Sequence, residues 1–259
     1  MKFNTISPDQ SISLFVKNIM VFEETENKQQ TVLPFFADGY PGLIFQETEN
    51  GLFVSPQNKQ MPTLFLYGQT LMPIELIMQG TYKLIVFQLF PFVLNSFFNV
   101  EPKDLNDKCY NLEQLPDESG IQVIEKLRKT KPRHKRISIL SDFLNALFEH
   151  KKKEIDLNIA SAIKKIIRKK GQVSIQELYN EIYLTERTFE RRFINAVGVT
   201  AKQFSKIIQF QQSLEQLTVK DYTNLTDIVY ANGFADQSHF IKVFKAFTGK
   251  TPSAFKSQK

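Results

Sequence analysis

The sequence predicts an α+β protein, with an N-terminal antiparallel β sandwich or barrel that carries some helices and an all-α region after it. Two features of the 259-residue chain predict this change of class. In the first half, short apolar runs recur at intervals of about ten residues, as they do in antiparallel sandwiches and barrels. From about residue 117, apolar residues recur at steps of three and four, which is the helical period. The chain length suits two modest domains.

Residues 1–116 make up the predicted β domain. Turn signals such as Ala37-Asp38-Gly39 and Asn50-Gly51 separate its apolar runs. The runs expected to form strands are Ile12–Val16, Leu43–Gln46, Leu64–Tyr67, Ile74–Met78 and Tyr82–Phe87. Many of the 24 phenylalanines of the chain fall in this half. They are expected to fill the core, with a hydrophobic ligand pocket as the alternative.

Residues 117–150 are predicted to form two helices around a basic, proline-containing break at residues 128–136. The second helix carries an apolar stripe made of Leu140, Phe143, Leu144, Leu147 and Phe148. This stripe suits dimerisation or transmission between domains, and packing on the β domain explains it equally well. A second break, at residues 150–154, precedes the C-terminal domain at residues 157–259. The helices expected there are Leu157–Lys170, Ile175–Tyr183, Glu186–Val197, Lys202–Leu217, Leu225–Asn232 and Gln237–Phe247.

The net charge of +6 is divided unevenly along the chain. Residues 1–125 hold 7 Lys/Arg and 15 Asp/Glu, a balance of −8. Residues 126–156 hold 10 and 4, a balance of +6, and residues 157–259 hold 16 and 8, a balance of +8. The basic C-terminal domain is therefore the part expected to face a polyanion, although a solvated lysine surface explains the charge as well.

Several classes of protein do not fit the composition. No apolar run is long enough to cross a bilayer, and the first residues lack the apolar stretch of a signal peptide, so a cytoplasmic location is expected. The single cysteine, Cys109, is expected to be a half-buried apolar residue. The three histidines, at 134, 150 and 239, all lie outside the β domain. Neither a metal site nor a catalytic constellation nor a cofactor motif is expected, and the chain is not expected to be an enzyme.

An internal repeat occupies the last ninety or so residues. At an offset of 51 the pattern Phe-x3-Phe-x4-Gly-x-Thr-x3-Phe occurs twice, beginning at Phe189 and at Phe240. Upstream the offset becomes 50, where Tyr183 corresponds to Gly233. One extra residue thus lies in the second copy, between its two helices.

Each copy has the features of a helix-turn-helix unit. A short helix is followed by a tight turn, and a cap residue, Thr185 or Asp236, begins a longer helix. Phenylalanines four residues apart give the longer helix an apolar face, which locks it onto the short one. Polar side chains are left on the opposite face, where they can reach base edges in DNA. A helical hairpin in any bundle could share this pattern, but two copies in a basic segment favour DNA binding.

The C-terminal sequence also resembles that of a known family. The segment DIVYANGFADQSHFIKVFK, residues 227–245, together with the GKTPSAF of residues 249–255, resembles the signature of AraC-type (AraC/XylS) transcriptional regulators. The segment LTERTFERRF, residues 184–193, is similar to the first helix-turn-helix of that family. The resemblance covers about residues 157 to 256. It implies two recognition helices in successive major grooves of one DNA face, held apart by the linker helix Lys202–Leu217.

The resemblance also implies which residues contact double-stranded DNA. In the first unit the base readers would be Arg187, Glu190 and Arg191, with Thr185 and Thr188 beside them. In the second unit they would be Gln237, Ser238, His239 and Lys242. Lys202, Lys206 and Lys245 are expected to contact phosphates.

Two residues of the first unit depart from the family pattern. Tyr179 stands where members usually have a small residue, so looser or rearranged packing is expected. Tyr183 stands at the glycine-like position of the turn, where a bulky residue is costly if the backbone needs a positive φ. The first unit is nevertheless expected to supply most base contacts.

The N-terminal half resembles the degenerate cupin-like sensor domain of some AraC-type regulators. The resemblance rests on Ala37-Asp38-Gly39-Tyr40-Pro41-Gly42 and on Leu66-Tyr67-Gly68-Gln69, with Gly42 where an acidic residue is more usual. It implies a bacterial regulator modulated through this domain, with RNA polymerase, a small-molecule effector and a second copy of the chain as candidate partners. The alternatives are a cupin-type enzyme and a protein-interaction module fused to the helical domain.

Overall fold

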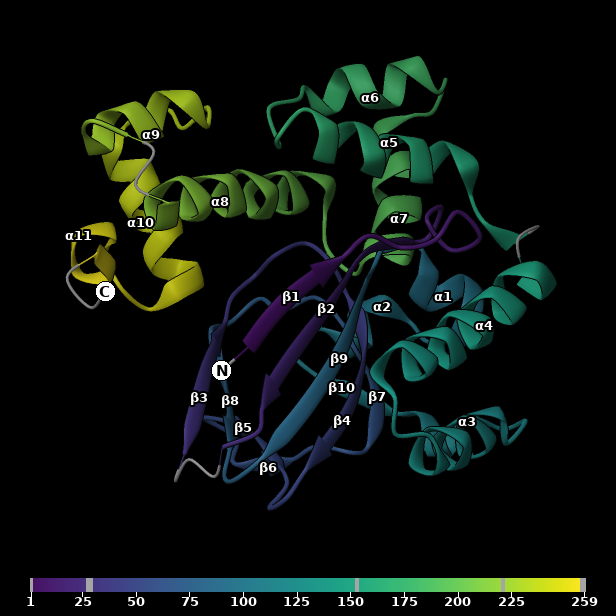
Figure 1. Ribbon diagram of the computed structural model, residues 1–259. Helices are drawn as coiled ribbons and strands as arrows, with labels where there is room; N and C mark the ends of the chain where they lie inside the picture. The colour runs from purple at the N-terminus through teal and green to yellow at the C-terminus, as the bar shows by residue number, and fades with distance from the viewer. Residues whose placement is uncertain (1, 27–29, 152–153, 220–221, 257–259) are drawn as a thin grey trace.

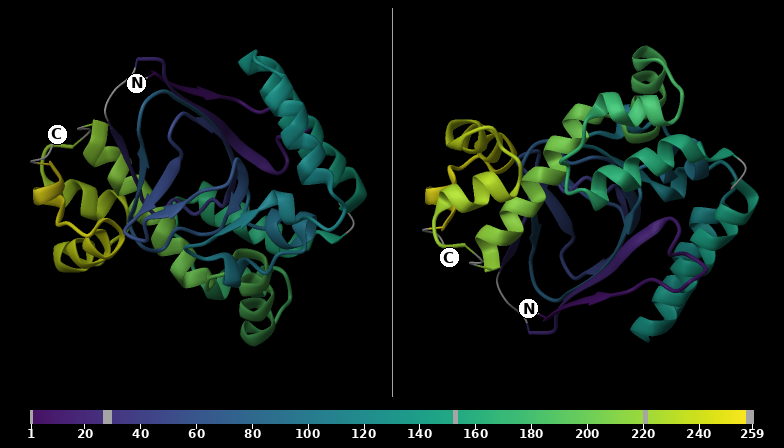
Figure 2. Two further views of the ribbon diagram at one scale, coloured as in Figure 1. Left: turned by 90° about the horizontal axis from the view of Figure 1, so that it is seen from below. Right: turned by 90° about the horizontal axis from the view of Figure 1, so that it is seen from above.

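The computed structural model describes residues 2–26, 30–151, 154–219 and 222–256. Two antiparallel sheets occupy the lower centre of the molecule in Figure 1, and the C-terminal helices lie across their upper end. Viewed along the perpendicular direction in Figure 2, the last helices (yellow) and the α3–α4 region (teal) lie on opposite sides of the sheets. The α+β class predicted from the sequence is confirmed.

The larger sheet has the strand order β1-β2-β9-β4-β7-β10, and the smaller has the order β3-β8-β5-β6. The larger sheet contains β1 (Lys2–Ile6), β2 (Val16–Glu24), β9 (Tyr82–Leu89), β4 (Gly42–Thr48), β7 (Leu64–Tyr67) and β10 (Cys109–Asn111). The smaller contains β3 (Thr31–Phe35), β8 (Ile74–Met78), β5 (Leu52–Ser55) and β6 (Lys59–Gln60). Buried side chains of both sheets face one another, which makes this domain a two-layered β structure.

One predicted strand, Ile12–Val16, is wrong. Its backbone forms local turns, in which the amide of Ser13 donates to the Asp9 carbonyl and the amide of Val16 donates to the Ile12 carbonyl. The turns place Ile12 and Phe15 three residues apart on one side, and both are fully buried. A short apolar run with local backbone hydrogen bonds of this kind has the same sequence pattern as a buried strand. The strand β2 begins only at Val16.

Helical segments of 3 to 19 residues follow or interrupt the described strands. They are α1 (Val93–Phe98), α2 (Pro102–Leu105), η1 (Leu112–Gln114), α3 (Ser119–Lys129) and α4 (Arg133–Lys151). The stripe of α4 packs on the β domain, because Leu140, Phe143 and Leu144 are buried and the Phe148 ring stacks on Phe15 at 4.8 Å. The sequence allowed dimerisation, transmission between domains or packing on the β domain as the role of this stripe. The structure shows packing on the β domain.

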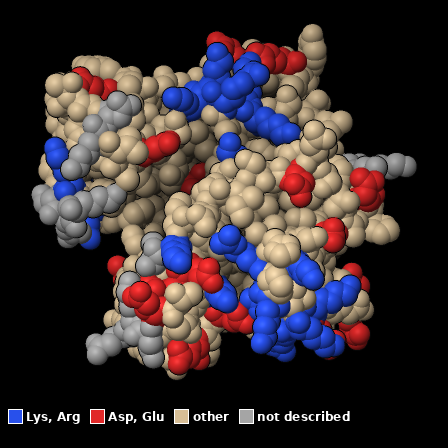
Figure 3. Space-filling model, in the orientation of Figure 1, with Lys and Arg blue, Asp and Glu red and all other residues tan. Residues whose placement is uncertain are grey.

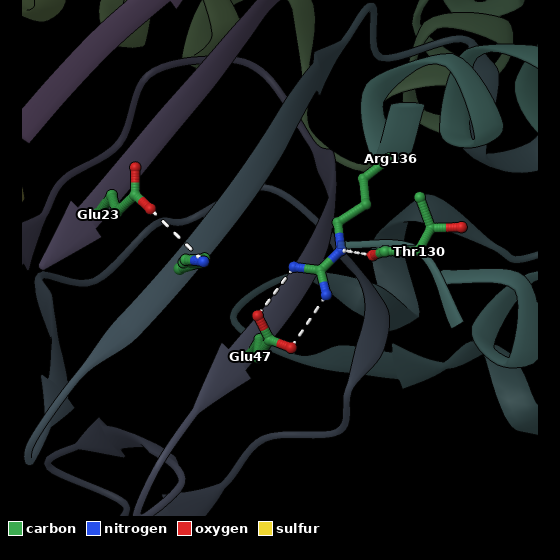
Figure 4. Close-up of polar contacts among 5 residues, drawn as sticks. Glu23, Glu47, Thr130 and Arg136 are labelled. Carbon is green, nitrogen blue, oxygen red and sulfur yellow. Dashed lines mark hydrogen bonds and ion pairs between the residues drawn. The ribbon is translucent and has the colours of Figure 1, made fainter. Parts of the chain in front are cut away.

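The predicted basic break at residues 128–136 is shorter than expected, because α4 already begins at Arg133. The guanidinium of Arg136 is almost completely buried and donates to both carboxylate oxygens of Glu47, at 2.8 and 2.9 Å (Figure 4). Its Nε donates to the carbonyl of Thr130, which ties the turn before α4 to β4. The hydrogen bonds from Arg136 lower the pKa of Glu47. Residues 152 and 153 of the second predicted break lie outside the described residues.

The C-terminal region contains α5 (Leu157–Arg168), α6 (Ile175–Glu181), α7 (Glu186–Val197), α8 (Ala201–Val219), α9 (Leu225–Ala231), α10 (Gln237–Thr248) and α11 (Pro252–Lys256). The repeat predicted from the sequence is present as α6–turn–α7 and α9–turn–α10, with α8 between the two units. The predicted helices agree with these to within a few residues.

The buried core does not stop at the end of the β domain. One cluster of buried apolar side chains continues from the larger sheet through α1 and α4 into α5, α7 and α8. The Asn106 amide donates to the Gly198 carbonyl at 2.9 Å, and the Phe36 and Phe255 rings meet edge to face at 5.8 Å. The helical region is therefore docked on the β domain at both of its units.

Candidate nucleic-acid interface

The two helix-turn-helix units share the same turn. Tyr183 has φ of 54° and Gly233 has φ of 70°, so both residues adopt the left-handed conformation. In both units the next amide reaches back to the first helix: Leu184 donates to Tyr179 and Phe234 donates to Val229, each at 3.0 Å. The first unit therefore pays the steric cost of a bulky residue at this position, on the order of 1 kcal/mol, without changing the turn. The Tyr183 side chain is 96% exposed.

The residue inserted in the second copy is located between the turn and the cap. Thr185 follows Leu184 directly and its hydroxyl accepts from the Thr188 amide, whereas Ala235 separates Phe234 from the cap Asp236. The Asp236 carboxylate accepts from the amide of His239 at 2.7 Å. Both predicted cap residues begin their helices as expected.

Tyr179 does not loosen the first unit. Its ring packs against Phe189 with centroids 6.2 Å apart, and Phe189 and Phe193 are fully buried. Phe240 and Phe244 are equally buried in the second unit. The larger side chain is thus accommodated by an aromatic contact, and the expected looser packing is not found.

In the first unit, the polar residues of α7 are not equally available to a ligand. Arg187 and Arg191 are exposed, as is the cap Thr185, and Thr188 is half-buried. Glu190 is half-buried as well and its carboxylate accepts from the Ala201 amide at the start of α8. Burial raises the pKa of Glu190. Glu190 is therefore engaged within the domain, which the sequence pattern did not predict.

In the second unit, four of the five predicted contact residues are exposed: Gln237, Ser238, Lys242 and Lys245. The exception is His239, which is half-buried with its ring edge-on to Phe234 at 5.7 Å. Its Nδ1 is buried and has no hydrogen-bond partner among the described residues. Of the two predicted phosphate contacts on α8, Lys202 is exposed and Lys206 is half-buried.

A contact between the two units was missed by sequence reasoning. Gln172 lies in the turn between α5 and α6, and its amide donates to the Ala231 carbonyl at the end of α9, at 2.9 Å. A Cβ at Gly233 would lie only 2.9 Å from the Gln172 side chain. The same turn approaches α8, where a Cβ at Gly171 would lie 2.3 Å from the Ser205 carbonyl. This turn therefore contacts both α8 and the second unit and helps to fix their positions.

The described residues contain neither a membrane-spanning helix nor a cluster of metal ligands. None of their helices is long and apolar enough to cross a membrane. Within the same ranges, no three side chains of His, Cys, Asp or Glu gather as a metal site would require.

Two parts of the chain match known protein families. Residues 178–258 match a family described as a helix-turn-helix domain, and residues 4–111 match a domain family of unknown function. The transcriptional activator RhaS of Yersinia pestis (strain Pestoides F) is 33% identical over 82 residues, which cover 32% of this chain and 30% of RhaS. RhaS of Yersinia pseudotuberculosis serotype O:1b gives the same figures. The C-terminal region is therefore a helix-turn-helix domain. The match spans only 30% of the length of these relatives.

Solved structures that match along most of the chain are distant in sequence. ToxT from Vibrio cholerae is 14% identical with a TM-score of 0.47, over 99% of this chain and 98% of ToxT. The AraC-like transcriptional activator CuxR is 9% identical with a TM-score of 0.29, over 89% of this chain and 90% of CuxR.

Exposed basic side chains outside the two helix-turn-helix units form two groups. Figure 3 shows Lys and Arg gathered over α5 and the turn after it, where Lys164, Arg168, Lys169 and Lys170 are exposed. A second group lies over α3 and the start of α4. Its exposed members are Lys126, Arg128, Lys129, Lys131, Arg133 and Lys135. Of these two groups, the first adjoins the helix-turn-helix units, and the basic run at residues 164–170 is the sequence signal that could have identified it.

Proposed function

We propose that the chain is a sequence-specific transcriptional regulator that inserts α7 and α10 into successive major grooves of double-stranded DNA, about 34 Å apart. The observation that carries this proposal is the pair of capped helices with buried phenylalanines on one face and exposed polar side chains on the other. Their location in a segment of net charge +8 supplies the electrostatic attraction to phosphates.

In the first unit we assign base reading to Arg187 and Arg191. Both are exposed, and arginine bonds bidentately to guanine. Thr185 and Thr188 are polar neighbours at the helix start, where backbone and hydroxyl donors contact phosphates. Glu190 remains a candidate only if it releases the Ala201 amide, so we rank it below the two arginines.

In the second unit we assign DNA contacts to Gln237, Ser238 and Lys242. Gln can pair with adenine, and the single lysine adds affinity. His239 is half-buried and ranks below them. Lys202, Lys206 and Lys245 are assigned to phosphates, and the exposed Lys169 and Lys170 join them as residues that the sequence pattern did not suggest.

We further propose that the N-terminal domain modulates DNA binding, since it is docked on both units of the C-terminal domain. RNA polymerase, a small effector and a second copy of the chain are the partners that such a regulator would use. The protein would act in the bacterial cytoplasm, where the chromosome lies, without catalysing a reaction.

The decisive experiment begins by selecting DNA duplexes bound by the full chain from a random pool. Affinity for the selected duplex is then measured against salt, for the wild type and for Arg191→Ala. We expect Arg191→Ala to lower affinity by about 10- to 100-fold and to relax preference at one base pair. Arg128→Ala, which removes an exposed arginine on α3, is the matched control and is expected to bind normally. Absence of any sequence preference at all salt concentrations would refute the proposal.

A further inference from the structure

A cavity of about 210 Å³ lies between the two sheets of the N-terminal domain. Most of its lining is apolar, including Phe35, Ile44, Met61, Phe65, Ile74 and Leu76. Side chains of other chemistry also line it, among them the thiol of Cys109, the ammonium of Lys59 and the phenol of Tyr67. The rest of the polar lining is Gln57, Thr70, Asp107 and Lys108. An apolar cavity with a few convergent polar groups is typical of a small-molecule site.

The cavity exists because of a row of three residues across the larger sheet. Gly42 on β4 pairs with Tyr67 on β7, and Tyr67 pairs with Cys109 on β10, so the three positions share one face. A Cβ at Gly42 would lie 2.5 Å from the Tyr67 ring and hydroxyl. The Tyr67 ring therefore lies in the space that a side chain at Gly42 would fill. This arrangement leaves room over the opposite neighbour, Cys109.

The polar groups of the cavity are not all satisfied by the protein. Tyr67 is only 8% exposed, yet its hydroxyl has no hydrogen-bond partner among the described residues. Burial raises the pKa of Tyr67 well above its usual range, so this group stays a hydrogen-bond donor. The hydroxyl is fully buried beside Gly42, on the side away from Cys109, so the Tyr67 ring shapes the cavity while its hydroxyl does not face the open space over the thiol.

The thiol is paired with a cation at the same cavity. The Lys59 ammonium donates a hydrogen bond to the Cys109 Sγ, with Nζ and Sγ 3.4 Å apart. Cys109 is half-buried and is the only cysteine in the sequence. A sulfur nucleophile, an adjacent ammonium and an apolar chamber together suit a ligand that carries an electrophilic carbon next to a carbonyl oxygen.

We propose that this cavity captures small apolar α,β-unsaturated carbonyl compounds by covalent addition to Cys109. The apolar walls hold the hydrocarbon body, and the sulfur attacks the β-carbon of the conjugated double bond. Lys59 is a positioning residue that stabilises the negative charge as it develops on the carbonyl oxygen.

The addition needs no further reactant. A carbon–sulfur bond forms while the carbon–carbon π bond breaks, and its electron pair moves through the α-carbon to the carbonyl oxygen. The proton lost by the thiol returns at the α-carbon. The net change is the addition of S–H across the double bond, with no oxidation or reduction. This inference does not rest on DNA binding, so either could fail alone.

The test compares rates of adduct formation on the full chain by intact-protein and peptide mass spectrometry. The probes are benzylideneacetone, an apolar conjugated ketone, and acrylamide, a small polar electrophile. N-acetylcysteine measures the intrinsic reactivity of each probe. We expect the ratio of the two rates at Cys109 to exceed the ratio for N-acetylcysteine by about tenfold or more, because the cavity binds the apolar probe first. Equal ratios would overturn the proposal.

Variants separate the contributions. Cys109→Ser should give no adduct. Ile74→Trp is designed to fill the cavity while leaving the Cys109 thiol and the Lys59 ammonium in place. It should reduce the rate ratio to that of N-acetylcysteine, while acrylamide still reacts with Cys109. Val54→Phe is a second variant that fills the cavity. Lys59→Met should slow benzylideneacetone several-fold, and an unchanged rate would remove Lys59 from the proposal. Benzylacetone, the saturated analogue, should slow the reaction by competition and leave no mass on the protein, and failure to compete would contradict binding in the cavity.

Discussion

At the scale of single residues, Asp38 carries a carboxyl group whose pKa is displaced by its surroundings. It lies in the loop between β3 and β4, beneath the linker helix α8, where Gly39 approaches Ile208 so closely that a Cβ would lie 2.8 Å away. The Asp38 carboxylate accepts from the Tyr40 amide at 2.9 Å and from the Gln88 side chain at 2.7 Å. Burial outweighs these hydrogen bonds and raises the pKa of Asp38 from 3.8 to about 7.

This pKa predicts a pH dependence of stability. Between about pH 4 and pH 7 the unfolded chain has lost the Asp38 proton while the folded protein retains it, so the free energy of unfolding falls as pH rises through this window. The slope from this group is at most about 1.4 kcal/mol per pH unit, and it vanishes above the folded pKa. Urea unfolding near pH 5 and near pH 8 should show this loss for the wild type and a smaller loss for Asp38→Asn. Asp142→Asn, at an exposed position on α4, should behave like the wild type. Identical pH profiles for the wild type and Asp38→Asn would contradict the prediction.

Tyr183 gives a second prediction at this scale. Because its φ is 54° and its side chain is 96% exposed, Tyr183→Gly removes backbone strain and almost no packing. We expect the free energy of unfolding to rise by about 0.5 to 1 kcal/mol, after the larger entropy of an unfolded glycine is subtracted. Tyr230→Gly is the matched control, since this tyrosine is 71% exposed but lies within α9. It should lower stability by about 1 kcal/mol, and an equal loss in both variants would argue against strain at Tyr183.

At the scale of elements, the turn between α5 and α6 governs how the two helix-turn-helix units are held. The Gln172 side chain, which lies in that turn, bonds to the second unit through the Ala231 carbonyl. Two recognition helices on one face of DNA must keep a fixed separation, because half-sites recur with the helical turn. A rigid connection would therefore matter for a site that engages both units and not for one that engages a single unit.

Gln172→Ala tests this connection. We expect weaker binding to a duplex that carries both selected half-sites, by about 3- to 10-fold, because orienting the units then costs entropy on binding. Binding to a duplex with one half-site should be unchanged, as should both affinities for Gln122→Ala, at an exposed position on α3. A uniform loss on both duplexes would mean that Gln172 acts on the fold of the domain instead.

At the scale of the whole molecule, one core joins the β domain to the first helix-turn-helix unit and to α8. Phe204 on α8 is fully buried against this core and lies near Gly39 of the β domain. A shared core predicts one cooperative unfolding transition rather than two. Unfolding followed by circular dichroism for the sheets and by proteolysis for the helices should coincide. Phe204→Ala should lower the free energy of unfolding by about 3 to 5 kcal/mol, equally by both measurements. Phe3→Ala, at a half-exposed side chain, should change it little by either measurement. Two separated transitions would show that the domains unfold independently.

Features that depend on neighbouring residues were predictable from the sequence, with one exception. The tandem units, their caps Thr185 and Asp236, and the position of the inserted residue could all be read from the sequence. Each depends on residues within a few positions of one another, so helical period and capping chemistry suffice. The turn at residues 10–15 was mistaken for a strand because five apolar-rich residues do not distinguish the two.

Long-range contacts account for what the sequence left open. Glu190 bonds to Ala201, Gln172 bonds to Ala231, and Gly42, Tyr67 and Cys109 meet in one row, although 67 positions separate the first from the last. No local propensity encodes such meetings, because they follow from strand order and from the packing of helices, which the whole chain decides together. The sequence by itself determined that this protein carries a duplicated helix-turn-helix motif. Only the tertiary structure decided which polar side chains of that motif are free, how its units are braced, and where a cavity opens in the other domain.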